Sequence, residues 1–269
     1  QTWGECWSKP QGEYCEFYFC EIVNSCDLET EPSLDLFRSE REMVEALGSL
    51  IDPPILRLDE TTESTVEVSA GETRALYYDA LEYQGSSTRV FAYIGIPASA
   101  SEENPVPGVV LVHGGGGTAY RSWVDQWTSR GYAAISIAVE GQNDDQATQL
   151  EIDNEQSVGS WHRHQAHGPA RVGAYGDTTL PIDEQWMYHA VADTILANSL
   201  LQSLPEVNAS EVGLMGVSWG AVITATVMGL DDRFAFAMPT YGHGHKFDIP
   251  NYFENALENN DMYRQLWDP

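Results

Sequence analysis

The sequence predicts an α/β fold in which a mostly parallel sheet carries helices on both faces. Continuous apolar runs, typical of strands buried on both faces, alternate with segments of helical periodicity. Two of these runs are followed directly by glycine-rich clusters. The composition is that of a packed globule, with 42% hydrophobic and 11% aromatic residues. A chain of 269 residues is long enough for one main domain and an appendage.

The expected elements begin with an amphipathic helix that ends at Pro53, because proline cannot continue a helix. Alternating segments separated by turn residues then predict antiparallel strands at one edge of the sheet. Buried strands that alternate with helices follow, which implies parallel pairing with right-handed crossovers. The helices are expected at 31–52, 120–130, 183–204 and 221–230, the antiparallel strands at 64–69, 73–81 and 88–96, and the buried strands at 109–113, 132–139, 212–217 and 234–239.

Residues 140–180 interrupt this alternation, because they are polar, rich in glycine and irregular. A loop of this length in a compact domain is usually functional or disordered. It carries His162, His164 and His167 near acidic residues. Three interpretations stay open: a loop that satisfies its own polar groups, a carbohydrate-binding cleft, or a metal site.

The N-terminal segment contains every cysteine of the chain. An even number of cysteines so close together favours two disulfides, and therefore an oxidising compartment. A zinc site is the competing interpretation, although no pair has the C-x-x-C spacing. The segment is either a stapled extension or a small carbohydrate-binding piece. We expect three parts: this segment over 1–30, a helical linker over 31–63 and the α/β domain over 64–269. The cysteines are Cys6, Cys15, Cys20 and Cys26.

The charge balance restricts the possible partners. Only 13 basic residues face 41 acidic ones, which gives a net charge of −28. Such a surface repels nucleic acid and anionic lipid, so neither is expected as a partner. No apolar run approaches the roughly 18 residues of a membrane span. The acidic residues are spread along the chain, as in proteins of saline environments or in ordinary acidic secreted proteins. We expect a secreted, extracellular or periplasmic protein, and the sequence does not indicate its oligomeric state.

One motif predicts a nucleophile. Gly216-Val217-Ser218-Trp219-Gly220 has the G-x-S-x-G pattern and lies between an expected buried strand and a helix, as a nucleophile elbow requires. The elbow holds its serine in a strained backbone conformation, and the flanking glycines avoid collisions with neighbouring backbone. A helix that begins directly after the serine favours developing negative charge. We therefore predict Ser218 as the catalytic nucleophile.

A second motif predicts an oxyanion site. His113 and the four glycines 114–117 follow a buried strand, and without side chains this loop can turn N–H groups toward a cavity. A phosphate-binding loop would need a lysine after its last glycine, and none follows. We expect the backbone N–H groups of Gly115, Gly116 and Trp219 to hold the oxyanion, and His113 to anchor the loop.

At this point the sequence resembles the acetyl xylan esterase group of α/β hydrolases, within the dienelactone-hydrolase and prolyl-oligopeptidase-like enzymes. The stretches that carry the resemblance are HGGGGTAY, QWMYHAVADTILANSLLQSLPEV, GVSWGA and DDRFAFAMPTYG, and it covers about residues 64–269. It implies an α/β-hydrolase fold and a serine carboxylesterase that deacetylates an acylated carbohydrate such as xylan, or a small ester, without cofactor or metal. Ala221 departs from the second glycine that is usual in this group.

The rest of a catalytic triad is missing from the sequence pattern. An α/β hydrolase orders its triad as serine, acid and histidine. One further strand follows Ser218, and only 27 residues remain after Gly242, too few for two more strand–helix units. We therefore expect the catalytic histidine and acid to be absent, the sheet to lack its last strands, and this chain alone to be inactive. His243 and His245 are the fallback bases.

Two other functions compete with a serine esterase. A prolyl-oligopeptidase-like serine peptidase normally holds the substrate amino terminus with acids on a separate domain, and no propeller-type repeat occurs here. A non-catalytic, carbohydrate-binding protein with a hydrolase fold is the other alternative. An intact glycine loop together with Ser218 argues against it. The favoured interpretation is a serine esterase whose substrate is an acylated carbohydrate.

Overall fold

The computed structural model describes residues 31–242, 266 and 267. The four cysteines, His243 and His245 lie outside these residues. The chain divides into two compact units, residues 1–42 and 43–269. The predicted three-part division stays a prediction. The boundary between the units falls within the helix α3 (Glu31–Ala46), which the 3-10 turn η2 (Leu47–Ser49) follows.

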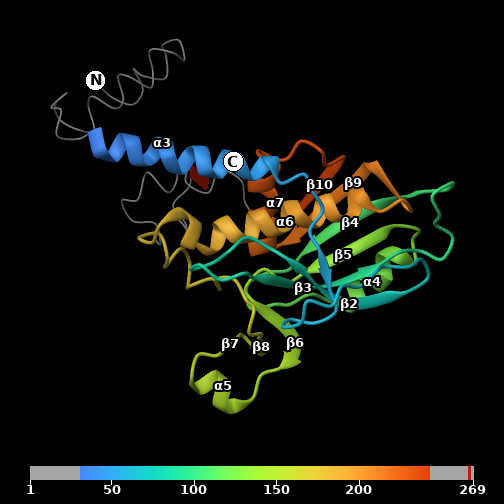
Figure 1. Ribbon diagram of the computed structural model, residues 1–269, viewed down its shortest axis with the longest axis horizontal. Coiled ribbons are helices and arrows are strands. Elements are labelled where there is room, and N and C mark those ends of the chain that lie inside the picture. The colour runs from blue at the N-terminus through green and yellow to red at the C-terminus, as the bar shows by residue number, and fades with distance from the viewer. Residues whose placement is uncertain (1–30, 243–265, 268–269) are drawn as a thin grey trace, which may run out of the picture. The chain divides into compact units, whose positions relative to one another are not determined.

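The centre of the second unit is a seven-stranded sheet, formed by β1 (Leu56–Arg57), β2 (Thr73–Asp79), β3 (Arg89–Gly95), β4 (Val106–Val112), β5 (Ala133–Ile137), β9 (Val207–Val217) and β10 (Phe236–Thr240). The strand order is β1-β2-β3-β5-β4-β9-β10 (Figure 1). The pairs from β1 to β5 are antiparallel. The pairs from β5 to β10 are parallel. This arrangement confirms the predicted α/β fold class and the antiparallel edge.

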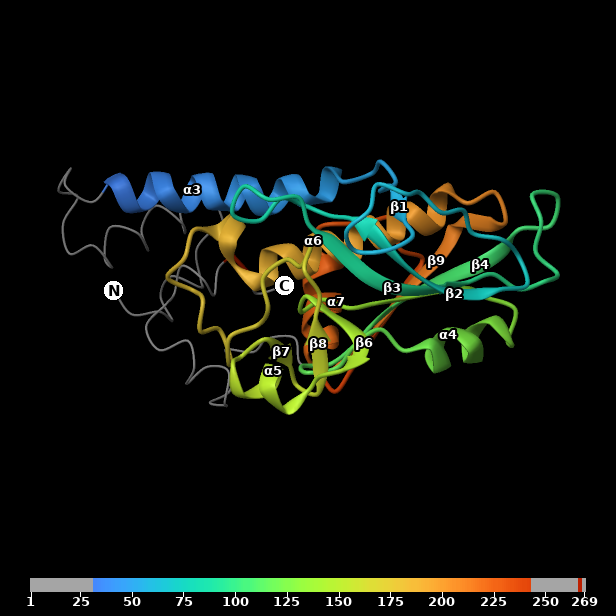
Figure 2. The same cartoon turned by 60° about the horizontal axis from the view of Figure 1, so that its bottom comes forward.

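Helices cover both faces of this sheet, namely α4 (Arg121–Thr128), α6 (Trp186–Ser203) and α7 (Trp219–Val227). On β4, Gly108 faces Leu201 of α6, whereas the alternate residues Val109 and Leu111 pack with Val124 of α4. Successive side chains of a strand point to opposite faces, so α4 and α6 lie on opposite sides of the sheet, as Figure 2 shows. Helix α7 packs on β9 and β10 beside α6. Among the described residues, no helix has the length and apolar character of a membrane span.

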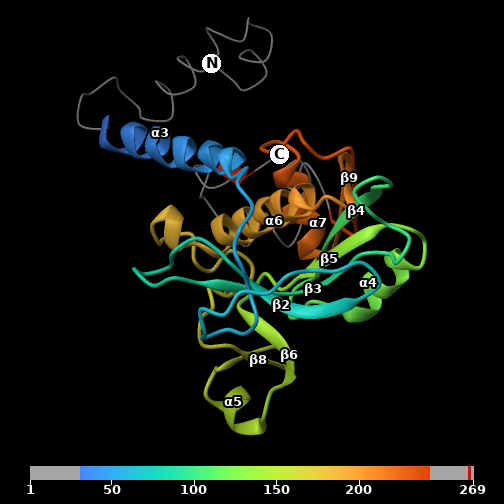
Figure 3. The same ribbon diagram turned by 45° about the vertical axis from the view of Figure 1, so that its right-hand side comes forward.

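The segment between β5 and α6 contains more regular structure than the sequence predicts, namely β6 (Gln142–Gln146), α5 (Gln149–Asp153), β7 (Ser157–Val158), β8 (Trp161–Arg163) and the 3-10 turn η3 (Ile182–Glu184). Strand β8 pairs antiparallel with both β6 and β7. Residues 142–163, which we call the excursion, extend away from the main sheet (Figures 1 and 3). The expectation of an irregular loop is therefore wrong over this part. Its short strands mix polar and apolar residues without regular alternation, so the sequence pattern does not reveal them.

The predicted strand at 64–69 is also wrong. Within it only Thr65 forms a bridge, to Arg57 in the short strand β1. Strand β1, in the segment expected as a linker, pairs with β2 instead. The Arg57 guanidinium also binds Asp79 at 2.6 Å, so a part-buried ion pair reinforces this short edge. Alternation in 64–69 was misleading because the segment has no neighbouring strand of matching length.

Candidate active site

Ser218 lies in the turn between β9 and α7. Its backbone has φ 56° and ψ −115°, a conformation that side-chain-bearing residues rarely adopt. Its N–H donates to Thr240 O on the neighbouring strand at 2.8 Å, and the residue is exposed. The glycines around it are required. A Cβ atom on Gly216 would lie 2.0 Å from Gly220 O, and one on Gly220 would lie 2.3 Å from Val112 O. The structure thus places Ser218 in the strained turn that the motif predicts.

Backbone strain is concentrated around this serine. Tyr241 directly follows Thr240, whose carbonyl oxygen accepts the Ser218 N–H. The Tyr175 ring packs edge-on against Trp219, the residue after Ser218, with ring centroids 5.3 Å apart. Both tyrosines share the positive φ of Ser218. Strain of this kind clusters at functional sites, so its distribution supports this turn as the candidate active site. In the described part of the chain, the non-glycine residues with positive φ are Gln84, Glu155, Tyr175, Ser218 and Tyr241.

The glycine loop after β4 lies directly against the nucleophile. A Cβ atom on Gly114 would lie 3.1 Å from Ser218 Cβ. One on Gly115 would lie 2.5 Å from the Arg171 guanidinium and 2.8 Å from the Trp219 ring. Side chains at these positions would therefore displace the residues that form the site. The loop needs glycine because other groups approach it so closely.

The two backbone donors predicted in this loop differ in their contacts. The N–H of Gly116 donates to Glu140 Oε2 at 2.8 Å. The N–H of Gly115 makes no hydrogen bond to any residue that the structure describes. Gly116 is thus engaged by a carboxylate, and Gly115 remains as the donor that this loop can offer to an oxyanion.

His113 anchors the loop, as the sequence predicts. The ring is buried, with Nδ1 2.6 Å from Gly114 O, while Nε2 accepts the N–H of Val139 at 3.0 Å. Because Nε2 accepts, the proton lies on Nδ1 and the ring is neutral, and burial lowers its pKa further. The Gln142 amide donates to Gly117 O at 2.5 Å and lies 3.0 Å from His113 Nε2. The ring therefore has a structural role.

Glu140 and Arg171 connect the glycine loop to the residue after the nucleophile. Glu140 is buried, and its Oε1 accepts from Arg171 Nε at 2.8 Å. The guanidinium carbon of Arg171 lies 5.0 Å from the centre of the Trp219 ring and 5.9 Å from that of Trp186. Sequence reasoning missed both residues. One signal existed, because Glu140 closely follows a buried parallel strand, whose carboxyl end faces the site in open α/β sheets.

The excursion also borders the glycine loop. At its β7–β8 turn, a Cβ atom on Gly159 would lie 2.7 Å from Gly116 O. Two residues later, the Trp161 ring lies 6.5 Å from that of Tyr120, which precedes α4. Part of the 140–180 segment is thus placed beside the candidate active site.

The histidines of this segment are not arranged as a metal site. Within the described ranges, no three His, Cys, Asp or Glu side chains are grouped so that they could hold a metal ion. The ring of His162 pairs with Glu151 of α5. The Nδ1 atom of His167 lies 2.7 Å from Gly168 O.

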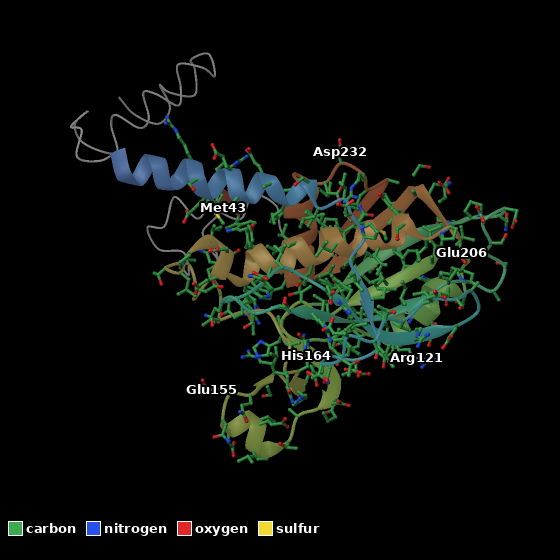
Figure 4. All side chains as sticks on the ribbon, in the orientation of Figure 1. Met43, Arg121, Glu155, His164, Glu206 and Asp232 are labelled. Atoms are coloured by element: carbon green, nitrogen blue, oxygen red, sulfur yellow. The ribbon has the colours of Figure 1, made fainter. Side chains whose placement is uncertain are left out.

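His164 is buried where the excursion joins the main sheet (Figure 4). Neither ring nitrogen has a hydrogen-bond partner among the described residues, and Nδ1 lies 3.6 Å from Glu60 Oε2, too far for a hydrogen bond. The ring packs edge-on against Tyr77 of β2, with centroids 5.1 Å apart. Burial, with the nearby His167 and His162, lowers the pKa of His164 to about 3. It therefore stays neutral and packs as an aromatic side chain.

The described part of the chain does not supply a base to Ser218. None of its histidines hydrogen bonds to Ser218 Oγ. His189, for example, is held in α6 by a contact of 2.7 Å between Nε2 and Asp183 O. The fallback bases His243 and His245 lie outside the described residues. The described histidines are His113, His162, His164, His167 and His189.

The family model described as acetyl xylan esterase (AXE1) matches residues 57–249. The chain belongs to the acetyl xylan esterase (AXE1) family. The match includes the elbow, the glycine loop and the excursion, so all three are features of the AXE1 part of the chain. Membership in the AXE1 family makes the protein a hydrolase of the carbohydrate-esterase type.

Two solved acetyl xylan esterases share the fold of this AXE1 chain. One, from a Paenibacillus species, is 21% identical to this chain. The alignment covers 84% of this chain and 71% of the Paenibacillus protein, with a TM-score of 0.56. Another, from a Thermoanaerobacterium species, is 18% identical. The alignment covers 87% of this chain and 67% of the Thermoanaerobacterium protein, with a TM-score of 0.52. No curated protein matches the chain. At these identities the likeness establishes the α/β-hydrolase fold.

Proposed function

We propose that the protein is a serine esterase that removes acetyl groups from an acylated carbohydrate such as xylan, with Ser218 as nucleophile. One observation carries the proposal: Ser218 stands exposed in a strained turn at the start of α7, directly against a glycine loop. This geometry presents a serine hydroxyl and backbone donors to the same carbonyl group. The acetyl group and the carbohydrate come from the family to which the chain belongs.

The proposed reaction has two steps. The base takes the hydroxyl proton of Ser218 as Oγ attacks the ester carbonyl carbon, and the N–H groups of Gly115 and Trp219 hold the oxyanion. The bond to the sugar oxygen breaks, that oxygen takes a proton from the base, and an acetyl-serine forms. Water then attacks the acetyl-serine, which releases acetate and restores Ser218. The beginning of α7 at Trp219 favours the negative charge in both steps.

The base is the open part of this proposal. No described histidine contacts Ser218, so we expect low activity from this chain alone unless His243 or His245 supplies the imidazole. Either histidine would follow β10, the strand whose Thr240 already binds the Ser218 backbone. We also propose that the protein is secreted, because disulfides among Cys6, Cys15, Cys20 and Cys26 would require an oxidising compartment.

The deciding experiment compares hydrolysis of p-nitrophenyl acetate by the purified chain and by its Ser218→Ala variant. Ser99→Ala is the matched control, because Ser99 is exposed and follows β3. Strand β3 runs antiparallel to β5, so its carboxyl end lies at the end of the strands opposite to Ser218. We expect a low rate from the original chain that falls to that of buffer in Ser218→Ala only. His243→Ala and His245→Ala then identify the base. Equal rates for the original chain and Ser218→Ala would contradict the proposal that this chain is a serine esterase.

A parallel assay tests the substrate class. Release of acetate from acetylated xylan supports a carbohydrate esterase, whereas cleavage of an acetylated amino-acid anilide with no acetate release from xylan would support the peptidase alternative. Binding of xylan by a chain without Ser218-dependent hydrolysis would instead support the non-catalytic, carbohydrate-binding alternative.

A further inference from the structure

Tyr241 leaves the sheet at the same point as the nucleophile. Thr240 and Val217 are partners in the parallel β10–β9 pair, so Tyr241 and Ser218 are the residues that directly follow this pair. The N–H of Ser218 donates to Thr240 O at 2.8 Å, which fixes the two turns to each other. Both residues have positive φ, 59° for Tyr241 and 56° for Ser218.

The strain at Tyr241 has no packing explanation within the described part of the chain. Its side chain is 91% exposed. Tyr175, with φ 65°, differs from Tyr241 because it is 5% exposed and packs edge-on against Trp219. A bulky aromatic residue in the left-handed region is uncommon, and glycine would fit there without strain. An unpacked aromatic residue held in that conformation beside a nucleophile indicates a function outside the fold itself.

We propose that the Tyr241 ring is a binding platform for a pyranose ring of the carbohydrate whose ester group reaches Ser218. This inference rests on the proposed function and names a residue that determines its substrate. Tyrosine combines a large apolar face, which can pack on the C–H groups of a sugar, with a hydroxyl that can hydrogen bond to sugar hydroxyls. Because Tyr241 lies next to the nucleophile, an ester carried by the bound sugar can reach Ser218.

A neutral sugar also fits the charge of the protein. The chain carries a net charge of −28, which disfavours anionic ligands. An exposed tyrosine adds no charge, so it can bind a neutral polymer at such a surface. The platform would act on binding of the sugar and leave the attack on the carbonyl group to Ser218.

The test measures binding of xylotetraose by calorimetry to the original chain and to Tyr241→Gly, Tyr241→Phe and Gln84→Gly variants. Xylotetraose has no ester, so turnover does not interfere. Gln84→Gly is the matched control, because Gln84 is also exposed with positive φ but lies in the turn between β2 and β3. We expect Tyr241→Gly to weaken binding about tenfold, which is a typical loss of one aromatic contact. Tyr241→Phe should remain within about threefold, since the ring face is kept, and Gln84→Gly should not change binding.

Thermal unfolding separates a binding role from a structural one. We expect Tm of Tyr241→Gly to stay unchanged or to rise, as in Gln84→Gly, because strain is relieved and no packing is lost. The proposal is overturned if the original chain does not bind xylotetraose, if Tyr241→Gly binds as tightly, or if its loss of binding accompanies a fall in Tm. Binding does not depend on hydrolysis. Loss of binding in Tyr241→Gly without Ser218-dependent activity would therefore contradict the proposed esterase and keep Tyr241 as a sugar-binding residue.

Discussion

The carboxylate of Glu140 accepts the backbone N–H of Gly116 at 2.8 Å and, with its other oxygen, the Nε–H of Arg171 at 2.8 Å. One buried side chain therefore holds both the glycine loop and the cation that lies on the Trp219 ring. A buried carboxylate is stable only with such donors, so the loop and the charge pair support each other.

Replacing Glu140 by alanine should destabilise the protein and impair the site together. The Arg171 charge would lose its partner, and we expect the free energy of unfolding to fall by about 3 kcal/mol. Ser218-dependent hydrolysis should fall as well, because the glycine loop loses its anchor. Urea unfolding and p-nitrophenyl acetate hydrolysis measure the two effects. Glu102→Ala is the control, since Glu102 is exposed. Equal stability of the two alanine variants would contradict this role.

Alanine at Gly216 should prevent the elbow from forming. Its Cβ atom would lie 2.0 Å from Gly220 O and 2.5 Å from Thr224 Oγ1, and the backbone oxygen cannot move aside like the end of a flexible side chain. We expect a loss of about 3 kcal/mol or more in the free energy of unfolding. The matched control is Gly229→Ala, whose Cβ atom would meet only Thr226 O, at 3.4 Å. The two variants should differ clearly in thermal unfolding, and a Gly216→Ala protein as stable as the control would refute the argument.

The buried ring of His164 should make the fold sensitive to acid. Its pKa in the folded state is about 3, well below the ordinary value of 6.5. Between these values the unfolded chain takes up a proton that the folded chain does not, so the free energy of unfolding falls as pH falls. From pH 7 to pH 5 this amounts to about 2 kcal/mol. His164→Phe removes the titration and keeps an aromatic ring. Urea unfolding at both pH values should show a smaller loss in this variant, and equal losses would contradict the assignment.

Salt should stabilise a chain with so large a negative charge. At a net charge of −28, repulsion among carboxylates opposes the compact state, and the Debye length falls from about 10 Å at 0.1 M to about 3 Å at 1 M ionic strength. We expect Tm to rise over this range of potassium chloride, as suits a saline environment. Sucrose, which carries no charge, is the control for general solvent effects. A Tm that does not change with salt would favour an ordinary acidic secreted protein.

Local signals explain which parts of the site could be predicted from sequence. The elbow at Ser218 and the loop at His113 each depend on residues within a few positions of one another, between a strand and a helix. Both motifs require glycine because the backbone has no room for side chains there, and such a cluster of glycines can be recognised in the sequence. The antiparallel strands at 73–81 and 88–96 could be predicted from alternation, and the buried strands from their continuous apolar runs.

Contacts between distant residues explain what the sequence did not reveal. Glu140 and Arg171 are separated by a segment without any period, so nothing in the sequence places one against the other. The excursion did carry one signal, since Thr148 and Glu151 form a capping box at α5. The pattern at 64–69 failed for a different reason. Alternation shows that a segment can be a strand, but pairing depends on the neighbour it finds.

The position of β4 in the sheet has a consequence for synthesis of the protein. Strand β4 pairs with β5 on one side, and on the other side with β9, where Val112 meets Gly216 about a hundred residues later. At translation rates of about 5–20 residues per second, the nascent chain carries β4 half-paired for roughly 5–20 s. The nucleophile turn follows β9, so it forms only when this gap closes. Until β9 has been made, β4 is an edge strand with one row of unpaired N–H and C=O groups.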